Sequence, residues 1–432
     1  MPTATRPAAD RRFLMLQGPH GPFFGQLADM LRLTGAEVWR IGVNAGDEAM
    51  WGRRPGYLAF RGDPADWPAF LAAEIAAKRI TDIVLYGDTR PIHAEAVRQA
   101  RASGLTAHVF EEGYLRPWWI TYERGGTNGH SRLMDMSLAE MRAALARSAT
   151  VTAEAPARWG DMRHHIAWGA RYHFHVALRN RGYPGFRPHR DLTVAQEFRL
   201  YLRRLLLMPL HAADRMIATR RVRSGQFPYH LVLMQLEHDA SFRAHSAFRS
   251  QTEFVTLCLD AFARGAPPHH HLVFKTHPLE DGRADVVRVI RAAARAHGIA
   301  DRVHVLRGGK LAALLAQARS AVTVNSTAAH QALWRGIPVR ALGRAVYARP
   351  GLVSDQPLAE FFARPDRPDA RMYLDFRSYL LETSQVPGGF YSAAGRRRLL
   401  RQVADLMLAP EDPYDALSLG TATPRQQLAL VR

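Results

Sequence analysis

The stretch Val109-Phe110-Glu111-Glu112-Gly113-Tyr114-Leu115-Arg116-Pro117 shows the pattern on which the chain is built. Its two leading apolar residues predict the end of a buried strand, and the carboxylates and glycine that follow predict a loop. An unpaired buried carboxylate costs several kcal/mol, so Glu111 and Glu112 are either solvated at a strand end or have a functional role. Gly113 permits tight backbone passage at this point.

Short apolar runs of the same kind recur along the chain and alternate with helical patterns. The first half has predicted strands at 12–17, 38–41, 83–86 and 107–110, and the second half at 231–236, 272–275, 303–306, 321–324 and 338–342. Helices are predicted at 245–263, at 283–297, from 311, and in the tail at 393–408. This alternation indicates an α/β fold with parallel sheets, which bind ligands outside the carboxyl ends of their strands.

The length of 432 residues exceeds one ordinary core, so two domains are expected. We predict two Rossmann-like domains that face a cleft, with a basic helical segment between them. The predicted ranges are 1–200 for the first domain including the basic segment, 220–385 for the second, and 386–432 for a C-terminal helical tail.

Composition limits the class of protein. The 47% hydrophobic and 22% charged fractions are those of a folded chain. No run of about 18 uncharged apolar residues predicts a membrane-spanning helix, and the start of the chain lacks the apolar core of a secretory signal. The single cysteine, Cys258, excludes an internal disulfide and a cysteine-based metal cage. We therefore expect a cytoplasmic protein.

The net charge of +19 predicts an anionic partner, which is nucleic acid, anionic lipid or an anionic substrate. Residues 151–230 contain 14 Arg and no Lys against five Asp or Glu, so this part contributes much of the excess. Nucleic acid is not expected, because no recognisable module is present and aromatic residues do not alternate with the basic runs.

Two loops in the first half follow predicted strands. Gly18 lies in a glycine-rich loop that lacks the spacing of a dinucleotide or P-loop motif. Asp88 and Arg90 stand beside a predicted helix start, where they either bind a hydroxylated, anionic ligand or pair with each other.

Three more loops follow strands in the second half. Asp239 lies just past a predicted strand with Gln235 and Ser241 nearby, which favours a carboxylate base or nucleophile held by hydrogen bonds; taken alone, the segment fits a helix N-cap better. Lys275 and His277 end another strand, and Pro278 fixes the direction in which the chain leaves. Asn325, Ser326 and Thr327 precede a predicted helix whose free N–H groups would bind phosphate.

A metal site is not predicted. The three histidines at 269–271 are contiguous and follow two prolines, so their side chains do not converge as an i, i+4 pair does. No Asp-x-Asp stands in the predicted cleft loops, which argues against a metal-dependent nucleotide-sugar enzyme. No cofactor is expected.

Together these loops resemble the capsule polysaccharide biosynthesis family, and in particular its KpsS-type Kdo transferases. The resemblance covers about residues 12–385 and is carried by FLMLQGPHGPFFGQL, NAGD, GDTRPIH, FEEGYLRPWWITYERGGTNG, RGYPGFRPHRDL, QLEHDASFRAHS, FKTHPLEDG and VNSTAAHQALWRGIPVRALGRAVYARPGL. Two departures concern Kdo itself: Thr276 stands where the family often has a second histidine, and the tyrosine–histidine pattern near Tyr183 is loosened.

The resemblance implies a GT-B-like, retaining, metal-independent glycosyltransferase that moves Kdo from CMP-Kdo to a phosphatidylglycerol-type lipid and initiates the capsule linker. One set of motifs favours this initiating enzyme over the longer two-module enzyme that extends the linker. The alternative of another class is a non-catalytic capsule export or assembly factor, with assembly proteins as partners. Either protein would be peripheral on the inner membrane, since an anionic surface attracts each nearby Arg by about 1 kcal/mol.

Within this interpretation each candidate residue has an expected role. Asp239 is the expected nucleophile and Glu112 the group that manages the acceptor proton, although the two roles are interchangeable at this stage. His277 is expected to contact the donor phosphate. The remaining donor-binding candidates are Gln235, Ser241, Lys275, Asn325, Ser326 and Thr327, and the other expected cleft residues are Gly18, Asp88, Arg90, Glu111 and Arg116.

Overall fold

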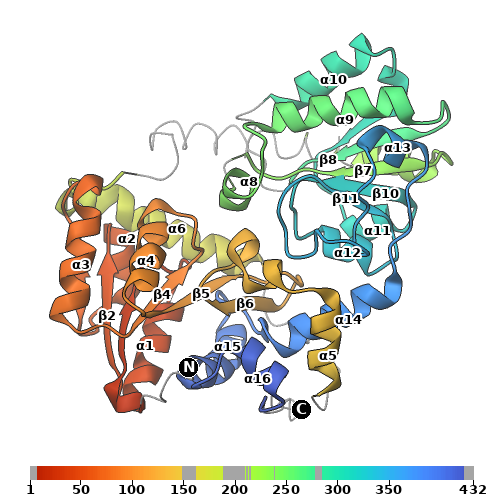
Figure 1. Cartoon of the computed structure of the whole chain (residues 1–432). Coiled ribbons are helices and arrows are strands. Elements are labelled where there is room, and N and C mark those ends of the chain that lie inside the picture. Colours follow the sequence, from red (N-terminus) through yellow and green to blue (C-terminus); the bar gives the residue numbers. More distant parts are fainter. Residues whose placement is uncertain are drawn as a thin grey trace. The chain divides into compact units, whose positions relative to one another are not determined.

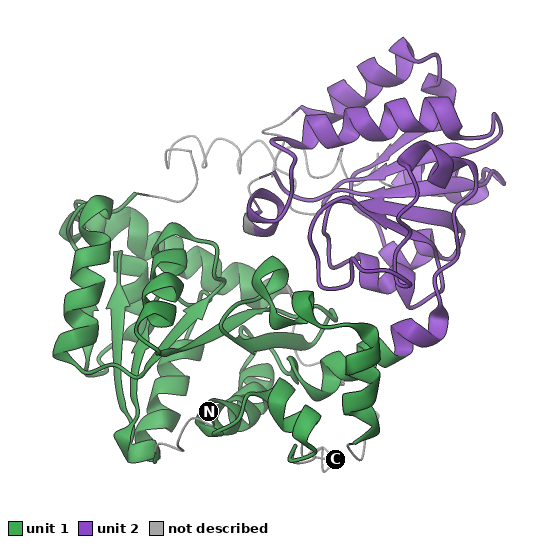
Figure 2. Ribbon diagram, viewed as in Figure 1, with its two compact units in different colours: residues 1–189, 375–432 green, residues 190–374 purple. Residues whose placement is uncertain are grey.

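The computed structural model describes residues 7–147, 162–187, 210, 213, 216–237, 239–277 and 285–422. The chain forms two compact units, which are coloured separately in Figure 2. Unit 1 consists of residues 1–189 and 375–432, and unit 2 of residues 190–374. Among the described residues, no helix has both the length and the apolar character needed to cross a membrane.

Unit 1 is built on a seven-stranded sheet with the order β12-β6-β5-β4-β1-β2-β3. Strands β1 to β5 are parallel, and β6 is antiparallel to both β5 and β12. The strands are β1 Arg12–Met15, β2 Glu37–Gly42, β3 Tyr57–Ala59, β4 Asp82–Tyr86, β5 Thr106–Glu112, β6 Trp119–Arg124 and β12 Gln385–Pro387.

Helices cover both faces of this sheet (Figure 1). Alternate residues of each strand point to opposite faces, so Phe13 and Met15 pack with α1 and α15, while Leu14 and Leu16 pack with α3 and α4. The helices of this part are α1 Phe23–Leu33, α2 Ala45–Trp51, α3 Trp67–Ala77, α4 Pro91–Ala102, α5 Leu138–Ala146, α6 Met162–Arg179, α14 Ala370–Glu382, α15 Ala393–Leu408 and α16 Pro413–Leu419.

Unit 2 contains an all-parallel sheet with the order β11-β10-β7-β8-β9. Its strands are β7 Tyr229–Leu233, β8 His271–Lys275, β9 Val303–Leu306, β10 Ala318–Thr323 and β11 Val339–Ala341. Its helices include α8 Ala240–Ala244, α9 Gln251–Gly265, α10 Val286–Ala296, α11 Leu311–Leu315, α12 Ala329–Leu333 and α13 Leu358–Ala363. Both sheets confirm the predicted α/β class with two Rossmann-like sheets.

Short 3-10 turns connect some of these elements, at Ala8–Asp10, Pro64–Asp66, Asn128–His130, Arg132–Asp135, Asn180–Gly182 and Ala300–Arg302. The tail helix predicted at 393–408 is α15, with the same bounds. It is not separate from the domains as the range 386–432 implied, because Leu399, Val403 and Met407 belong to the core of unit 1. The predicted second domain also extends to 385, whereas unit 2 ends at Leu374.

Two predicted boundaries are wrong. The helix expected from residue 245 begins at Gln251, because Ser250 accepts a hydrogen bond from the Glu253 N–H and thereby sets the helix start. Glu111 and Glu112 are the last residues of β5 and do not lie in a loop. Strand β6, which the sequence pattern did not predict, pairs with them and so extends β5.

A buried histidine makes unit 2 sensitive to acid. On β7, His230 Nδ1 lies 2.7 Å from Ser320 Oγ, and its Nε2 lies 3.0 Å from His270 Nδ1. Burial lowers the pKa of His230 to about 3, so the ring stays neutral in the folded unit. In the unfolded chain it binds a proton near pH 6.5. The contribution of His230 to the free energy of unfolding is therefore fully present above about pH 6.5. It is lost as the pH falls from there toward 3.

We expect the free energy of unfolding to be about 2 kcal/mol smaller at pH 5 than at pH 7.5 through this group. Urea unfolding at the two pH values measures the difference. The variant His230→Asn keeps a hydrogen-bonding side chain but does not titrate. Its free energy of unfolding should therefore fall by about 2 kcal/mol less than that of the wild type between pH 7.5 and pH 5. An equal loss in both proteins would show that His230 is not the responsible group.

Candidate functional site

Each sheet has one point where the strand order reverses, and open α/β sheets bind ligands there. In unit 1 the chain runs from β1 to β2 and β3, and then returns to β4 on the other side of β1. Gln17 follows β1 and Arg90 follows β4 at this point. Arg90 Nη1 donates to Gln17 Oε1 at 2.6 Å, so the two loops are joined.

Asp88 holds a different loop at the same edge. Its buried carboxylate accepts the Thr127 N–H at 2.9 Å and lies 3.1 Å from His130 Nδ1. The described contacts therefore pair Asp88 with Thr127 and His130, and Arg90 with Gln17, and do not pair Asp88 with Arg90. Gly18 has a packing role, because a Cβ there would lie 2.7 Å from the Phe24 ring.

The acid pair ends β5 among aromatic side chains. Glu111 and Glu112 are half-buried, and Tyr86 donates to Glu112 Oε1 at 3.5 Å. The ring of His165, from α6, stacks on Tyr391 with centroids 4.2 Å apart. Burial, and then the charge of Glu112, raise the pKa of Tyr391 well above its ordinary value. This phenol stays protonated and can donate a hydrogen bond. Glu112 therefore lies beside two hydroxyl donors, those of Tyr86 and Tyr391.

Burial also lowers the pKa of His165, while the Glu112 carboxylate opposes that shift. Arg116 is exposed, and its Nε donates to the Gly113 carbonyl at 3.2 Å. Gly113 fits as predicted for a tight passage, because a Cβ there would lie 2.2 Å from the Trp119 carbonyl oxygen. Unit 1 thus presents Glu112, Tyr391 and His165 beside the reversal point.

In unit 2 the strand order reverses between β7 and β10. Gln235 follows β7 and Asn325 follows β10, and their side-chain amides join these two ends. Gln235 Nε2 donates to Asn325 Oδ1 at 2.8 Å, and Asn325 N donates to Gln235 Oε1 at 3.1 Å. Asn325 Nδ2 donates to the carbonyl oxygens of Ser241 and His245 at 2.9 and 3.3 Å. Both amides fasten loops to one another, which is a positioning role.

Asp239 caps α8, as the helix-cap interpretation predicted. Its Oδ1 accepts the Ser241 N–H at 3.0 Å, and the side chain is half-buried. The cap fixes the direction of the carboxylate and engages Oδ1. Capping α8 does not exclude Asp239 from acting as a nucleophile, because its second carboxylate oxygen, Oδ2, has no hydrogen-bond partner among the described residues.

Ser326 and Thr327 do not open helix α12 as the sequence pattern predicted, and the phosphate site expected at their N–H groups stays a prediction. Helix α12 begins at Ala329, is five residues long, and follows a turn in which the Ala328 N–H is already bonded to Ser326 Oγ at 3.3 Å. The Ser326 carbonyl accepts the Tyr347 hydroxyl at 2.7 Å. The Ser326 N–H donates to Thr323 Oγ1 at 3.3 Å, so the N–H groups of Ser326 and Ala328 are both engaged within the loop.

The two remaining donor-side candidates end β8 or follow it. Lys275 is buried, and that burial lowers the pKa of its ammonium. His277 is half-buried, one residue beyond Thr276, whose N–H bonds the Leu306 carbonyl at 3.0 Å. Pro278 lies outside the described residues.

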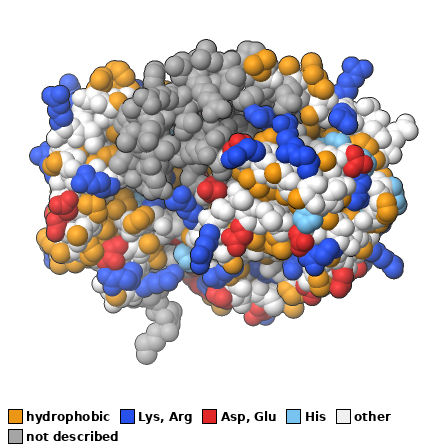
Figure 3. All heavy atoms as spheres, turned by 90° about the horizontal axis from the view of Figure 1, so that it is seen from above, with side chains coloured by type: hydrophobic (Ala, Val, Ile, Leu, Met, Phe, Trp, Pro, Cys, Tyr) orange, Lys and Arg blue, Asp and Glu red, His pale blue; other side chains and the backbone are white. Residues whose placement is uncertain are grey.

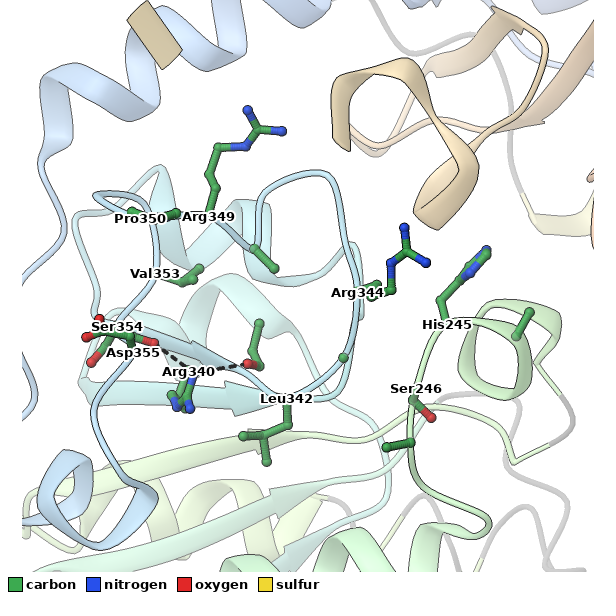
Figure 4. Close-up of a pocket in the computed structure, with 15 residues that line it drawn as sticks. His245, Ser246, Arg340, Leu342, Arg344, Arg349, Pro350, Val353, Ser354 and Asp355 are labelled. Carbon is green, nitrogen blue, oxygen red and sulfur yellow. Dashed lines mark hydrogen bonds between the residues drawn. The ribbon is translucent and has the colours of Figure 1, made fainter. Parts of the chain in front are cut away.

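A cavity of about 670 Å³ lies where β11 and α8 end. Figure 4 shows Arg344 and His245 on one side of it, and Arg340, Ser354 and Asp355 on the other. With Arg349 the lining has three arginines and one carboxylate. Arg340 donates to the Ser354 carbonyl at 3.1 Å, while its buried Nε has no hydrogen-bond partner among the described residues. The cavity is therefore suited to an anion.

None of the predicted donor-side residues is among those that line this cavity. Gln235 and Asn325 lie directly behind it, because Asn325 binds the carbonyl of the lining residue His245. Sequence reasoning missed the arginines because all but three of the 58 basic residues are Arg, so arginine alone is no signal. The available indication was that Arg344 and Arg349 follow the predicted strand end at Leu342, while Arg340 lies within that strand.

The family model described as "Capsule polysaccharide biosynthesis protein" matches residues 81–391. The chain is 30% identical over 392 residues to the "Capsule polysaccharide export protein KpsS" of Escherichia coli, covering 88% of this chain and 97% of that protein. It is 32% identical over 386 residues to the "Capsule polysaccharide modification protein LipB" of Neisseria meningitidis serogroup B, covering 88% and 91%.

Among solved structures, the chain is similar to the β-Kdo 2,7 transferase of Thermosulfurimonas dismutans KpsC. The TM-score is 0.44 with 12% sequence identity, and the match covers 92% of this chain and all of that one.

Proposed function

Because the chain belongs to the capsule polysaccharide biosynthesis protein family, we propose that it is a retaining glycosyltransferase that moves Kdo from CMP-Kdo to a phosphatidylglycerol-type lipid. The observation that carries the proposal is the cavity of unit 2, with its three arginines and one carboxylate. CMP-Kdo carries a phosphate and a carboxylate, and arginine is the side chain best matched to both groups. The cavity volume of about 670 Å³ is within the range of small-molecule sites.

A retaining transfer has two displacement steps in this proposal. The Asp239 carboxylate attacks the anomeric carbon of Kdo, and CMP leaves with the bonding electron pair. The acceptor hydroxyl then attacks the same carbon, Glu112 takes the hydroxyl proton, and the bond to Asp239 breaks. The reversed assignment of the two acids is the alternative.

Positive charge for the departing CMP comes from Arg340, Arg344 and Arg349 in this scheme. Fixed guanidinium groups near a leaving phosphate stabilise the charge that develops there. We therefore propose that the transfer needs no metal ion. The lipid acceptor places the reaction at the inner face of a membrane, to which the protein binds peripherally.

The direct test is to incubate the purified chain with CMP-Kdo and fluorescent lyso-phosphatidylglycerol, with and without a chelator. The expected product has the mass of the acceptor plus one Kdo, and the chelator leaves its yield unchanged. If a folded protein gives no product, the second candidate is favoured, which is an export or assembly factor; the Escherichia coli relative is called an export protein.

Replacing Arg340 with methionine should weaken CMP binding about 10- to 150-fold, because a hydrogen bond to a charged group is worth about 1.5–3 kcal/mol. Titration calorimetry with CMP measures this. Arg335→Met is the matched control, since Arg335 is exposed, lies in the same unit and is not part of the cavity lining. Equal CMP affinity in the two variants would remove the cavity from the proposal.

A further inference from the structure

Helix α6 has an inner face that is firmly attached to unit 1. The Tyr172 hydroxyl accepts from Gln17 Nε2 and from Asn44 Nδ2, each at 2.8 Å, and donates to Asp47 Oδ1 at 3.3 Å. Trp168 Nε1 donates to the Tyr391 carbonyl at 3.2 Å. The half-buried Trp168 therefore faces inward.

The outer face of the same helix is apolar and exposed. Ile166, Phe174 and Leu178 have exposed fractions of 61, 60 and 64%. They lie eight and four residues apart, which places them along one side of a helix with 3.6 residues per turn. Figure 1 shows α6 beside α2 at the margin of unit 1. Large apolar side chains with this exposure and spacing form a continuous stripe, and such a stripe marks an interaction surface.

The charge beside the stripe identifies its partner. Residues 162–182 contain four Arg, four His and no Asp or Glu. Arg163 lies three residues before Ile166 and Arg171 lies seven residues before Leu178, spacings that place both arginines on the side of the helix that carries the stripe. On the face drawn in Figure 3, Lys and Arg lie among acidic side chains. A uniformly negative surface matches a long basic and apolar stripe better than a local acidic patch on a protein does.

We propose that the outer face of α6, defined by Ile166, Phe174 and Leu178 with Arg163 and Arg171, docks on an anionic phospholipid bilayer. Helices with an apolar face and a basic polar face lie in the plane of the interface, with the apolar side chains inserted below the head groups. The inner face of the helix carries His165 beside Tyr391 and near Glu112. Docking would thus bring the acid pair close to lipid head groups. This consequence rests on the proposed function, whereas the docking itself does not.

Vesicle flotation tests the proposal in the absence of CMP-Kdo, so its outcome does not depend on transfer. The wild-type chain should float with vesicles of equal phosphatidylglycerol and phosphatidylcholine at 50 mM salt, and not with pure phosphatidylcholine. The double variant Phe174→Ser/Leu178→Ser should bind at least about tenfold more weakly, because both apolar side chains leave water on insertion. Arg163→Gln/Arg171→Gln should weaken binding and reduce its dependence on salt.

Leu33→Ser is the matched control, since Leu33 is 87% exposed and lies at the end of α1, away from α6. It should float like the wild type, and circular dichroism melting should show that all variants are folded. Equal binding by the control and the double variant would overturn the proposal. Failure of the wild type to float with either vesicle would overturn it as well and leave an acidic protein as the occupant of the stripe. Flotation as expected without any Kdo transfer would uphold the docking and refute the proposed function.

Discussion

Replacing Asp239 with asparagine is expected to abolish Kdo transfer, by at least about 1,000-fold, in a protein that remains folded. A nucleophile needs the carboxylate charge, and removal of a catalytic nucleophile typically costs several orders of magnitude. The side chain also caps α8 through the Ser241 N–H, and asparagine caps a helix as well as aspartate does. The melting temperature and CMP affinity should therefore stay close to those of the wild type.

The matched control is Asp285→Asn, which makes the same change at another N-cap of unit 2, at the start of α10. It should leave transfer unchanged. His277→Ala should fail differently from Asp239→Asn, by weakening CMP-Kdo binding about 10- to 150-fold through a lost charged contact. Full activity of Asp239→Asn would rule out the nucleophile, and full capsule production in cells by both the Asp239 and His277 variants would favour the assembly factor.

Replacing Arg40 with methionine should cost unit 1 about 3–5 kcal/mol of unfolding free energy. Arg40 Nη2 and Asp47 Oδ1 are 3.2 Å apart, with exposed fractions of 2 and 0%. Burial raises the pKa of Asp47, and Arg40 opposes that shift. Without the guanidinium, a carboxylate would be buried unpaired, which is the costly case. Urea unfolding at pH 7.5 measures the loss.

Arg12→Met supplies the comparison, because its partner Glu37 is half exposed and such surface pairs contribute about 0–1 kcal/mol. Adding Asp47→Asn to the Arg40 variant removes the buried charge and should recover part of the stability. Similar losses in the Arg12 and Arg40 variants would contradict the importance of the buried pair. Because Asp47 also accepts the Tyr172 hydroxyl, the Arg40 variant should loosen α6 as well.

Strand and helix positions were largely accessible from the sequence, since apolar runs with period two or 3.6 reflect local burial. The strand predicted at 303–306 is β9, and the tail helix predicted at 393–408 is α15. The same patterns included Gln17 and Gln235 in the predicted strands, whereas β1 ends at Met15 and β7 ends at Leu233. Strand β6 escaped prediction, because its pairing with β5 depends on the loop through Gly113 and on contacts that no local pattern encodes.

The sequence by itself determined the α/β class, the two sheets and the family, because alternation and long motifs are carried by neighbouring residues. Only the tertiary structure decided what the candidate residues do. It turned Gln235 and Asn325 toward each other and placed Arg340 and Arg344 at the cavity. It also left the stripe of α6 outside the core. Hydrogen-bond partners and exposure depend on segments that are distant in the chain, so they follow from packing and not from spacing.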